Sequence, residues 1–351
     1  MARRRRDEPA ALHLRRPPRP YPRRQADGRP YLRPRARRRG GVSGGPRFLV
    51  FGASGHIGGP LAAALARVHG AASLRLASSS AAKRDALGER FPGAEAAVVD
   101  YLDQAATEAA LAGVEAVFVV TPDFFPERRG AEVLLAAAEA AGVRPHVVRV
   151  QAEVPGMTAD RLPPELSGPV GRRGHLEARA LIERSGLPAT FLNVFGYYMD
   201  DLLIHFAGPL RDERTLLVPY DRPMCWIDPR DLGEAAARVM AGPPPAAPRL
   251  LHLNSGEDGV SFSALAAMLS EELGTPIRHV DDPDAFGRAV GPMLTAMTGD
   301  PRAADYLLAD WRMERDHAAL YRGIGDLAAL LGREPVALRP WIAEHRARLL
   351  G

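Results

Sequence analysis

Three glycines near residue 50 constrain the fold of this chain most strongly. The apolar run Phe48–Phe51 leads directly into Gly52, Gly55 and Gly58, which are spaced three residues apart. Between a strand and a helix, such glycines permit a tight turn, close backbone approach to a pyrophosphate and close helix–strand packing. The free N–H groups at the helix start then face the phosphates. The sequence therefore predicts a dinucleotide-binding loop, with a tight turn that binds no ligand as the alternative. The expected contact residues are Gly52, Ser54, Gly55, His56, Ile57 and Gly58.

Apolar runs typical of buried parallel strands alternate with helical stretches from residue 47 to residue 194. This alternation predicts an α/β fold, a Rossmann-type doubly wound parallel sheet. The expected strands are Phe48–Phe51, Ser73–Ala77, Ala96–Val99, Ala116–Val120, His146–Val150 and Ala189–Val194. The expected helices lie near 57–68, 81–89, 104–112, 127–142 and 173–185.

The regular alternation ends near residue 195, which predicts a smaller, partly helical C-terminal lobe beside the sheet. We therefore expect a dinucleotide-binding domain over 46–194 and a substrate-binding lobe over 195–351 that completes the same fold. The expected strands of the lobe are Leu216–Val218 and Leu250–Leu253. Its expected helices lie near 231–241, 262–273, 284–298 and 302–333, and a last one starts at about Pro340.

Residues 1–45 form an Arg- and Pro-rich tail that we expect to be disordered, because it offers too little apolar surface to offset the entropy of ordering. Residues 1–47 carry 16 arginines and 3 acids, whereas the rest of the chain has 30 basic and 39 acidic residues. The high pI of about 9.5 therefore belongs to the tail. The tail could be an arm for nucleic acid, a solvated segment without a role, or the product of a start codon assigned too early. Nothing else in the chain supports nucleic-acid binding, so we do not expect a nucleic-acid partner.

Cysteine content and hydropathy limit the remaining classes of protein. The only cysteine is Cys225, so an intrachain disulfide and a cysteine-rich zinc site are excluded. The chain has no apolar run of about 18 residues, and we expect no membrane span. No histidines show metal-ligand spacing, and no metal is expected. We expect a cytoplasmic protein with a small-molecule substrate, and the oligomeric state is not indicated.

The end of the second expected strand indicates which dinucleotide is bound. An acid about 20 residues after the glycines would hold a ribose 2′-hydroxyl. The chain instead has Ser78-Ser79-Ser80 followed by Lys83 and Arg84. Hydroxyls with cations favour a 2′-phosphate, so NADP(H) is preferred and NAD(H) is possible. The alternative is that Lys83 and Arg84 are solvated on a helix face.

Further cofactor contacts are expected where the next strands end, because ligands bind at the carboxyl edge of such sheets. Asp100 would accept a hydrogen bond from the adenine amine, with Tyr101 beside it, or Asp100 would cap a helix. Thr121 and Pro122 would lie beside the nicotinamide ribose. Gln151, at the end of a central strand, would contact the cofactor. Gln151 or Glu153 could also orient the substrate, and the alternative for both is only a loop role.

Several segments in order resemble the NmrA-like branch of the atypical short-chain dehydrogenase/reductase superfamily. The resemblance covers roughly residues 47–345. It rests on Gly52–Gly58, Val99–Asp103, Ala138–Val143, His175 with Ser185–Thr190, and Trp226–Asp231. It implies an NAD(P)-binding Rossmann fold and reduction of small quinones, carbonyls or imines. Some family members instead sense dinucleotides and regulate other proteins, and that is our alternative; an NAD(P)-dependent epimerase or dehydratase is a minor one.

The proton donor cannot follow the usual short-chain dehydrogenase pattern. That pattern pairs a tyrosine with a lysine that lowers its pKa, and the only lysine here is Lys83, in the cofactor half. The remaining candidates for proton transfer are His175, Tyr197 and Tyr198. His175 has an ordinary pKa suited to proton transfer near neutrality, or is a surface or capping histidine. Tyr197 and Tyr198 begin the second lobe, and their alternative role is an aromatic lining that shapes the pocket.

Overall fold

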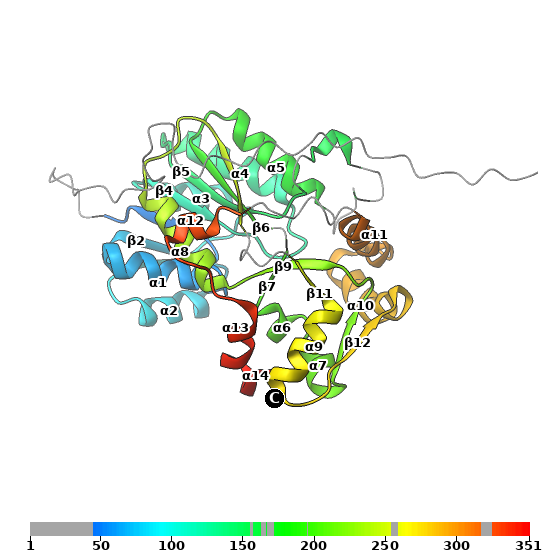
Figure 1. The fold of residues 1–351 in the computed structure, drawn as a ribbon. Coiled ribbons are helices and arrows are strands. Elements are labelled where there is room, and N and C mark those ends of the chain that lie inside the picture. The colour runs from blue at the N-terminus through cyan, green and yellow to red at the C-terminus, as the bar shows by residue number, and fades with distance from the viewer. Residues whose placement is uncertain are drawn as a thin grey trace, which may run out of the picture.

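The computed structural model describes residues 45–154, 157–162, 166, 172–194, 196–253, 259–316 and 325–351. The Arg/Pro-rich segment 1–44 lies outside these ranges, so its predicted disorder stays a prediction. The described chain forms two parts, a sheet with its covering helices and a second lobe. Figure 1 shows a sheet with its covering helices in the upper part and a second lobe below it.

Within the described ranges, seven strands form one parallel sheet in the order β10-β6-β5-β4-β1-β2-β3. The order reverses between β1 and β4, which places a binding crevice at their carboxyl ends. This confirms the predicted Rossmann-type doubly wound sheet. The strands are β1 (Phe48–Val50), β2 (Leu74–Ser78), β3 (Glu95–Val98), β4 (Ala116–Val119), β5 (His146–Gln151), β6 (Ala189–Val194) and β10 (Arg249–Leu253).

Helices cover both faces of the sheet because its central strands are apolar on both sides. Phe48, Val50 and Phe118 pack with one set of helices, whereas Leu49 and Val117 pack with the other. The first set is α1 (Gly58–His69), α8 (Pro229–Ala241) and α12 (Leu327–Leu331). The second set is α3 (Gln104–Leu111), α4 (Glu127–Ala140) and α5 (Arg173–Arg184), while α2 (Ala81–Arg90) connects β2 to β3.

The second lobe has its own apolar core, centred on aromatic side chains such as Trp226, Phe262, Trp311 and Trp341. Two small sheets, β11-β9-β7 and β12-β8, lie among its described helices. The strands are β7 (Gly196–Tyr198), β8 (Thr215–Val218), β9 (Pro223–Ile227), β11 (Val260–Ser261) and β12 (Arg278–Asp281). The helices are α6 (Asp201–Ile204), α7 (Ala207–Asp212), α9 (Phe262–Leu273), α10 (Pro283–Thr298), α11 (Ala303–Asp316), α13 (Leu338–Glu344) and α14 (Arg346–Leu350); two short 3-10 helices are η1 (Ala71–Ser73) and η2 (Ala159–Arg161).

Two details differ from the sequence-based expectation. Strand β10 and helix α8 lie beyond residue 195, yet β10 pairs with β6 and α8 packs on α1. The chain therefore leaves the sheet layer and returns to it. The single helix expected over 302–333 is also wrong, because residues 325 and 326 are not helical and α12 is a separate helix. The N–H of Asp326 donates to the carbonyl of His252, which ties α12 to β10 instead of to α11.

Candidate functional site

The glycine loop adopts the turn that its spacing predicts. Gly52 has φ +65°, and the N–H of Gly55 donates to the carbonyl of Gly52 at 2.9 Å. A Cβ at Gly58 would lie 2.2 Å from that same carbonyl oxygen, so α1 can start here only with glycine. Ser54, Gly55 and His56 are exposed in front of α1, whereas Ile57 is buried. With no acid in the first turn of α1, this exposed helix start fits a pyrophosphate.

The carboxyl end of β2 offers a cation and a capped helix start. Ser78 is buried, and the Ser80 hydroxyl caps α2 by accepting from the Lys83 N–H. The Lys83 side chain is exposed, whereas the guanidinium of Arg84 pairs with Asp85 at 2.7 Å. Among the predicted contacts at this strand end, Lys83 is therefore the cation better placed to meet a 2′-phosphate.

Asp100 and Tyr101 follow β3. The Asp100 carboxylate is exposed and accepts from the Leu102 N–H at 2.8 Å, while Asp103 caps α3. The alternative of a helix cap at Asp100 is therefore wrong. Tyr101 stacks on Phe51. Its hydroxyl already has a partner, because it donates to the carbonyl of Val120, directly after β4.

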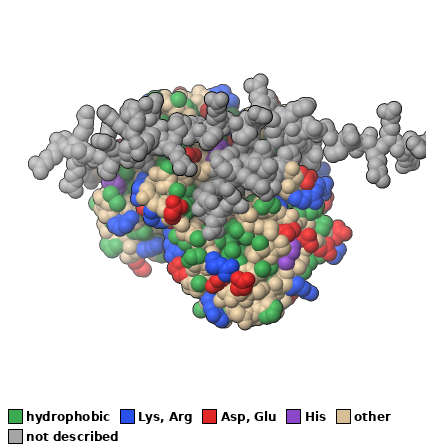
Figure 2. All heavy atoms as spheres, in the orientation of Figure 1, with side chains coloured by type: hydrophobic (Ala, Val, Ile, Leu, Met, Phe, Trp, Pro, Cys, Tyr) green, Lys and Arg blue, Asp and Glu red, His purple; other side chains and the backbone are tan. Residues whose placement is uncertain are grey.

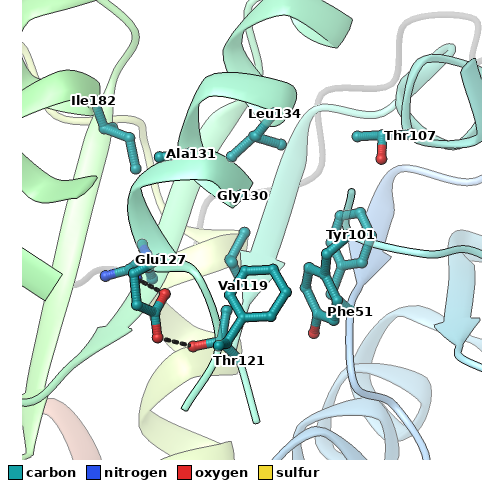
Figure 3. Close-up of a pocket in the computed structure, with 12 residues that line it drawn as sticks. Phe51, Tyr101, Thr107, Val119, Thr121, Glu127, Gly130, Ala131, Leu134 and Ile182 are labelled. Carbon is teal, nitrogen blue, oxygen red and sulfur yellow. Dashed lines mark hydrogen bonds and ion pairs between the residues drawn. The ribbon is translucent and has the colours of Figure 1, made fainter. Parts of the chain in front are cut away.

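A buried charge network lies beneath the loop that follows β4. The carboxylate of Glu127, at the start of α4, pairs with Arg149 of β5 at 2.5 Å and accepts from the Thr121 hydroxyl at 2.5 Å. Figure 3 shows the Glu127 carboxylate joined to the Thr121 hydroxyl by a dashed line. Glu127, Thr121 and Arg149 all line a small cavity of about 20 Å³. The network fixes Thr121, and Thr121 and Pro122 also line a much larger cleft.

That cleft has a volume of about 920 Å³ and lies between the sheet and the second lobe. Its sheet side includes His56 of the glycine loop as well as Thr121 and Pro122. Helix α10 forms an apolar wall, in which the exposed fractions of Met293 and Met297 are 53% and 55%. Figure 2 shows hydrophobic side chains gathered on the face of the second lobe. Large, mostly apolar clefts with a few polar groups are typical of small-molecule sites.

His175 lines this cleft, but its environment does not suit a proton donor. Burial, together with the guanidinium groups of Arg149 and Arg172, lowers the pKa of His175 to about 3. The ring is therefore neutral near pH 7, which differs from the ordinary histidine pKa expected from the sequence, and a catalytic role for His175 stays a prediction. Its Nδ1 lies 3.6 Å from Glu127, so His175 belongs to the edge of the buried network.

Tyr197 and Tyr198 also line the cleft. Burial raises the pKa of both tyrosines above the usual range, so both stay protonated at neutral pH. Tyr197 stacks on Trp226 with ring centres 5.3 Å apart. The rings of Tyr198 and His56 meet in a T-shaped arrangement, with ring centres 5.1 Å apart. These contacts favour an aromatic lining over proton transfer.

Gln151 and Glu153 are not among the described residues that line the cleft. The Gln151 side chain is fully buried and donates to the carbonyl of His175 at 3.1 Å, so it supports α5, and its contact with the cofactor stays a prediction. Glu153 is 1% exposed and pairs with Arg179, and burial raises its pKa to about 7.

Asp201 is the residue that sequence reasoning missed. It lines the cleft, and its carboxylate accepts from the Tyr198 N–H at 2.9 Å. Burial, with a smaller contribution from neighbouring Asp200, raises the pKa of Asp201 to about 7. Asp200 itself pairs with His56, Nδ1 to Oδ2 at 2.9 Å. The adjacent acids in Tyr197–Asp201 were a visible signal, but only folding brings them to the glycine loop.

Two curated proteins of similar sequence are reductases. The chain is 30% identical over 300 residues to a (4-alkanoyl-5-oxo-2,5-dihydrofuran-3-yl)methyl phosphate reductase of Streptomyces griseus, covering 85% of this chain and 97% of that one. It is 31% identical over 236 residues to an NAD(P)H azoreductase of Xenophilus azovorans, covering 66% of this chain and 76% of that one.

Solved structures share the fold at lower identity. An NADPH-dependent quinone oxidoreductase of Escherichia coli, in complex with NADPH, aligns with TM-score 0.67 and 22% identity over 87% of this chain and all of that one. A Citrobacter triphenylmethane reductase in complex with NADP(H) aligns with TM-score 0.65 and 19% identity over 85% and 99%.

The family assignment rests on a match over most of the chain. The NmrA-like family model matches residues 46–298, which include the whole glycine loop and most of the cleft. In the part of the chain that the structure describes, no helix is long and apolar enough to cross a membrane. Because this match covers more than half of the sequence, the chain belongs to the NmrA-like family.

Proposed function

We propose that this protein is an NADP(H)-dependent oxidoreductase that reduces a small, largely apolar carbonyl, quinone or imine. The observation that carries the proposal is the continuity of the site: one cleft of about 920 Å³ includes His56 of the glycine loop, Thr121 after β4 and the apolar wall of α10. The reductase relatives support the same reaction class. A cytoplasmic location is part of the proposal, since the single cysteine, Cys225, suits a reducing compartment.

The residues present fit a dinucleotide along the carboxyl edge of the sheet. The exposed loop Ser54–His56 would bind the pyrophosphate through backbone N–H groups, Lys83 would pair with the 2′-phosphate, and Thr121 and Pro122 would border the nicotinamide end. When bound, the reduced nicotinamide supplies a hydride. The chain's own part is to align the substrate, exclude water and provide a proton.

The two walls of the cleft indicate what the substrate looks like. Apolar side chains of α10, among them Val290, Met293 and Met297, form one wall. On the opposite side, Arg128 pairs with Glu132 and Arg173 pairs with Glu177, which leaves a mixed-charge rim. Methionine side chains adapt to differently shaped apolar groups. We therefore propose a substrate with an apolar body and a polar end at the rim.

Turnover is tested directly by following the absorbance of NADPH with a panel of quinones, aldehydes and imines. The expected result is oxidation of NADPH by at least one class, with loss of both binding and turnover in Gly55→Asp, because a carboxylate there repels the pyrophosphate. Tight and discriminating binding of NADPH over NADP⁺ without turnover would instead support the sensor alternative. Tight binding that does not distinguish the two forms, again without turnover, would exclude both.

Removal of the Lys83 ammonium should shift the choice of dinucleotide. A charge-assisted hydrogen bond to phosphate contributes about 1.5–3 kcal/mol, so Lys83→Ala is expected to lower the ratio of NADP⁺ to NAD⁺ affinity at least about 10-fold. The measurement is calorimetric titration with each dinucleotide. Arg84→Ala is the matched control with a smaller expected effect, because Arg84 already pairs with Asp85. An unchanged ratio in Lys83→Ala would refute the 2′-phosphate assignment.

A further inference from the structure

Asp201 has a position that sets it apart among the acids lining the cleft. It is the first residue of α6, and its side chain is 7% exposed yet lines the cleft. One carboxylate oxygen accepts from the Tyr198 N–H at 2.9 Å, and the other lies 3.5 Å from Nε2 of His205. Asp201 therefore lines the cleft and also lies next to a histidine side chain.

The groups around Asp201 come from three elements. Asp200 precedes it, and His56 of the glycine loop and Asp123 of the loop after β4 act on it electrostatically. His205, at the end of α6, completes the set. The two carboxylates disfavour a charge on Asp201, the Tyr198 N–H and His56 favour one, and burial disfavours it most, so its pKa rises to about 7. A carboxyl group with that pKa exists in both protonation states near neutrality.

His205 connects this carboxyl group to solvent. Its side chain is 53% exposed, and its Nε2 lies 3.5 Å from Asp201 and 3.9 Å from Asp123. An imidazole ring has two nitrogens, one of which can accept a proton while the other donates one. A proton can thus pass from water to His205 and then to Asp201.

We propose that Asp201 is the proton donor for substrate reduction and that His205 reprotonates it from solvent. This inference rests on the proposed oxidoreductase function. It supplies the group that the absent tyrosine–lysine pair provides in other short-chain dehydrogenases.

The proton balance of the step is simple for a carbonyl substrate. As the carbonyl carbon accepts a hydride from the reduced nicotinamide, the electron pair of the C=O π bond moves to oxygen. That oxygen takes the proton of the Asp201 carboxyl group, which leaves an alcohol and a carboxylate. The carboxylate then takes a proton from Nε2 of His205, and the His205 ring takes one from solvent.

Other titratable groups fit this role less well. His175 lines the cleft but is neutral, and its pKa of about 3 makes it too weak a base to hold a proton to donate. Tyr197 and Tyr198 have pKa values above their usual range, which makes them weak acids. Glu153 has a pKa near that of Asp201, but it faces Arg179 inside the protein and does not line the cleft.

The first test measures the proton itself in the cofactor-free protein. Infrared difference spectra of wild type and Asp201→Asn are recorded from pH 5 to pH 9. We expect protonated carboxyl absorption that disappears with a midpoint near pH 7 in wild type, and Asp201→Asn should lose the part that Glu153→Gln keeps. Glu153→Gln is the matched control, because it removes the band of another buried carboxyl group outside the cleft.

The second test is the pH profile of hydride transfer with a substrate from the panel. Wild type should lose activity above about pH 7, because a deprotonated Asp201 cannot donate. Asp201→Asn should be about 100-fold slower at pH 6 and should lack this alkaline limb, whereas Asp201→Glu should recover part of the rate and Glu153→Gln should keep the wild-type profile. His205→Ala should slow turnover, and added imidazole should restore it.

Failure of the inference and failure of the function give different results. If wild type turns over and Asp201→Asn keeps both its rate and its alkaline limb, Asp201 is not the donor although the function stands. If imidazole does not restore His205→Ala, the solvent path is wrong. If no substrate is turned over while the Asp201 band still titrates, the oxidoreductase function is wrong and the donor role falls with it.

Discussion

Replacing Gly58 with alanine is expected to abolish dinucleotide binding and to destabilise the fold. The new Cβ would lie 2.2 Å from the carbonyl oxygen and 2.7 Å from the carbonyl carbon of Gly52. These are backbone atoms in the turn that begins with Gly52 at φ +65°, so no side chain can move to relieve the contact. Either the turn opens or α1 shifts away from β1, and both changes remove the pyrophosphate site.

The measurements are calorimetric titration with NADP⁺ and the thermal midpoint of unfolding. We expect at least a 1,000-fold loss of affinity, on the order of 4 kcal/mol, together with a lower Tm. The control is Gly88→Ala in α2, where a Cβ would meet open space and alanine favours the helix. Near wild-type binding by Gly58→Ala would show that the loop does not form the cofactor site.

Glu314→Gln is expected to lower the free energy of unfolding by about 3–5 kcal/mol, because it breaks a buried ion pair. Glu314 of α11 pairs with Arg222, whose side chain is 0% exposed, and with Arg172 at the start of α5. Burial opposes the charge on Glu314, but the two arginines outweigh it and lower its pKa. Loss of the carboxylate would leave the positive charges of Arg172 and Arg222 with less negative charge beside them. The Arg222 guanidinium also lies over the Trp311 ring, 3.8 Å from its centre.

Urea denaturation at pH 7 measures this cost. The matched control is Glu271→Gln, because Glu271 also pairs with an arginine, Arg339, but its side chain is 65% exposed. Exposed pairs contribute little, and the control should unfold near the wild-type midpoint. Because the pKa of folded Glu314 is lowered, its contribution is present at neutral pH and is lost as the pH falls through that value. Equal midpoints for the two variants would contradict the buried network.

The sheet was predictable because its signals are local. The glycine spacing at Gly52–Gly58 and the apolar runs of β1, β4 and β5 are read within a few residues, and the strands are buried on both faces. The second lobe was predicted less well, since β7 and β9 are short and pair with distant partners. Helix α12 starts beside β10, where the Asp326 carboxylate accepts from the N–H of His252, 74 residues away in the sequence.

Sequence alone determined the Rossmann-type sheet, the place of the glycine loop, and the absence of a tyrosine–lysine pair, since each depends only on residue identity and spacing. Only the tertiary structure decided the proton affinities of the side chains in the cleft. The pKa of His175 falls because the site is buried and Arg149 and Arg172 lie beside it, and the pKa of Asp201 rises because burial and carboxylates from separate elements surround it. Proton affinity depends on desolvation and on charges within a few ångströms, and folding brings those charges together from distant parts of the chain.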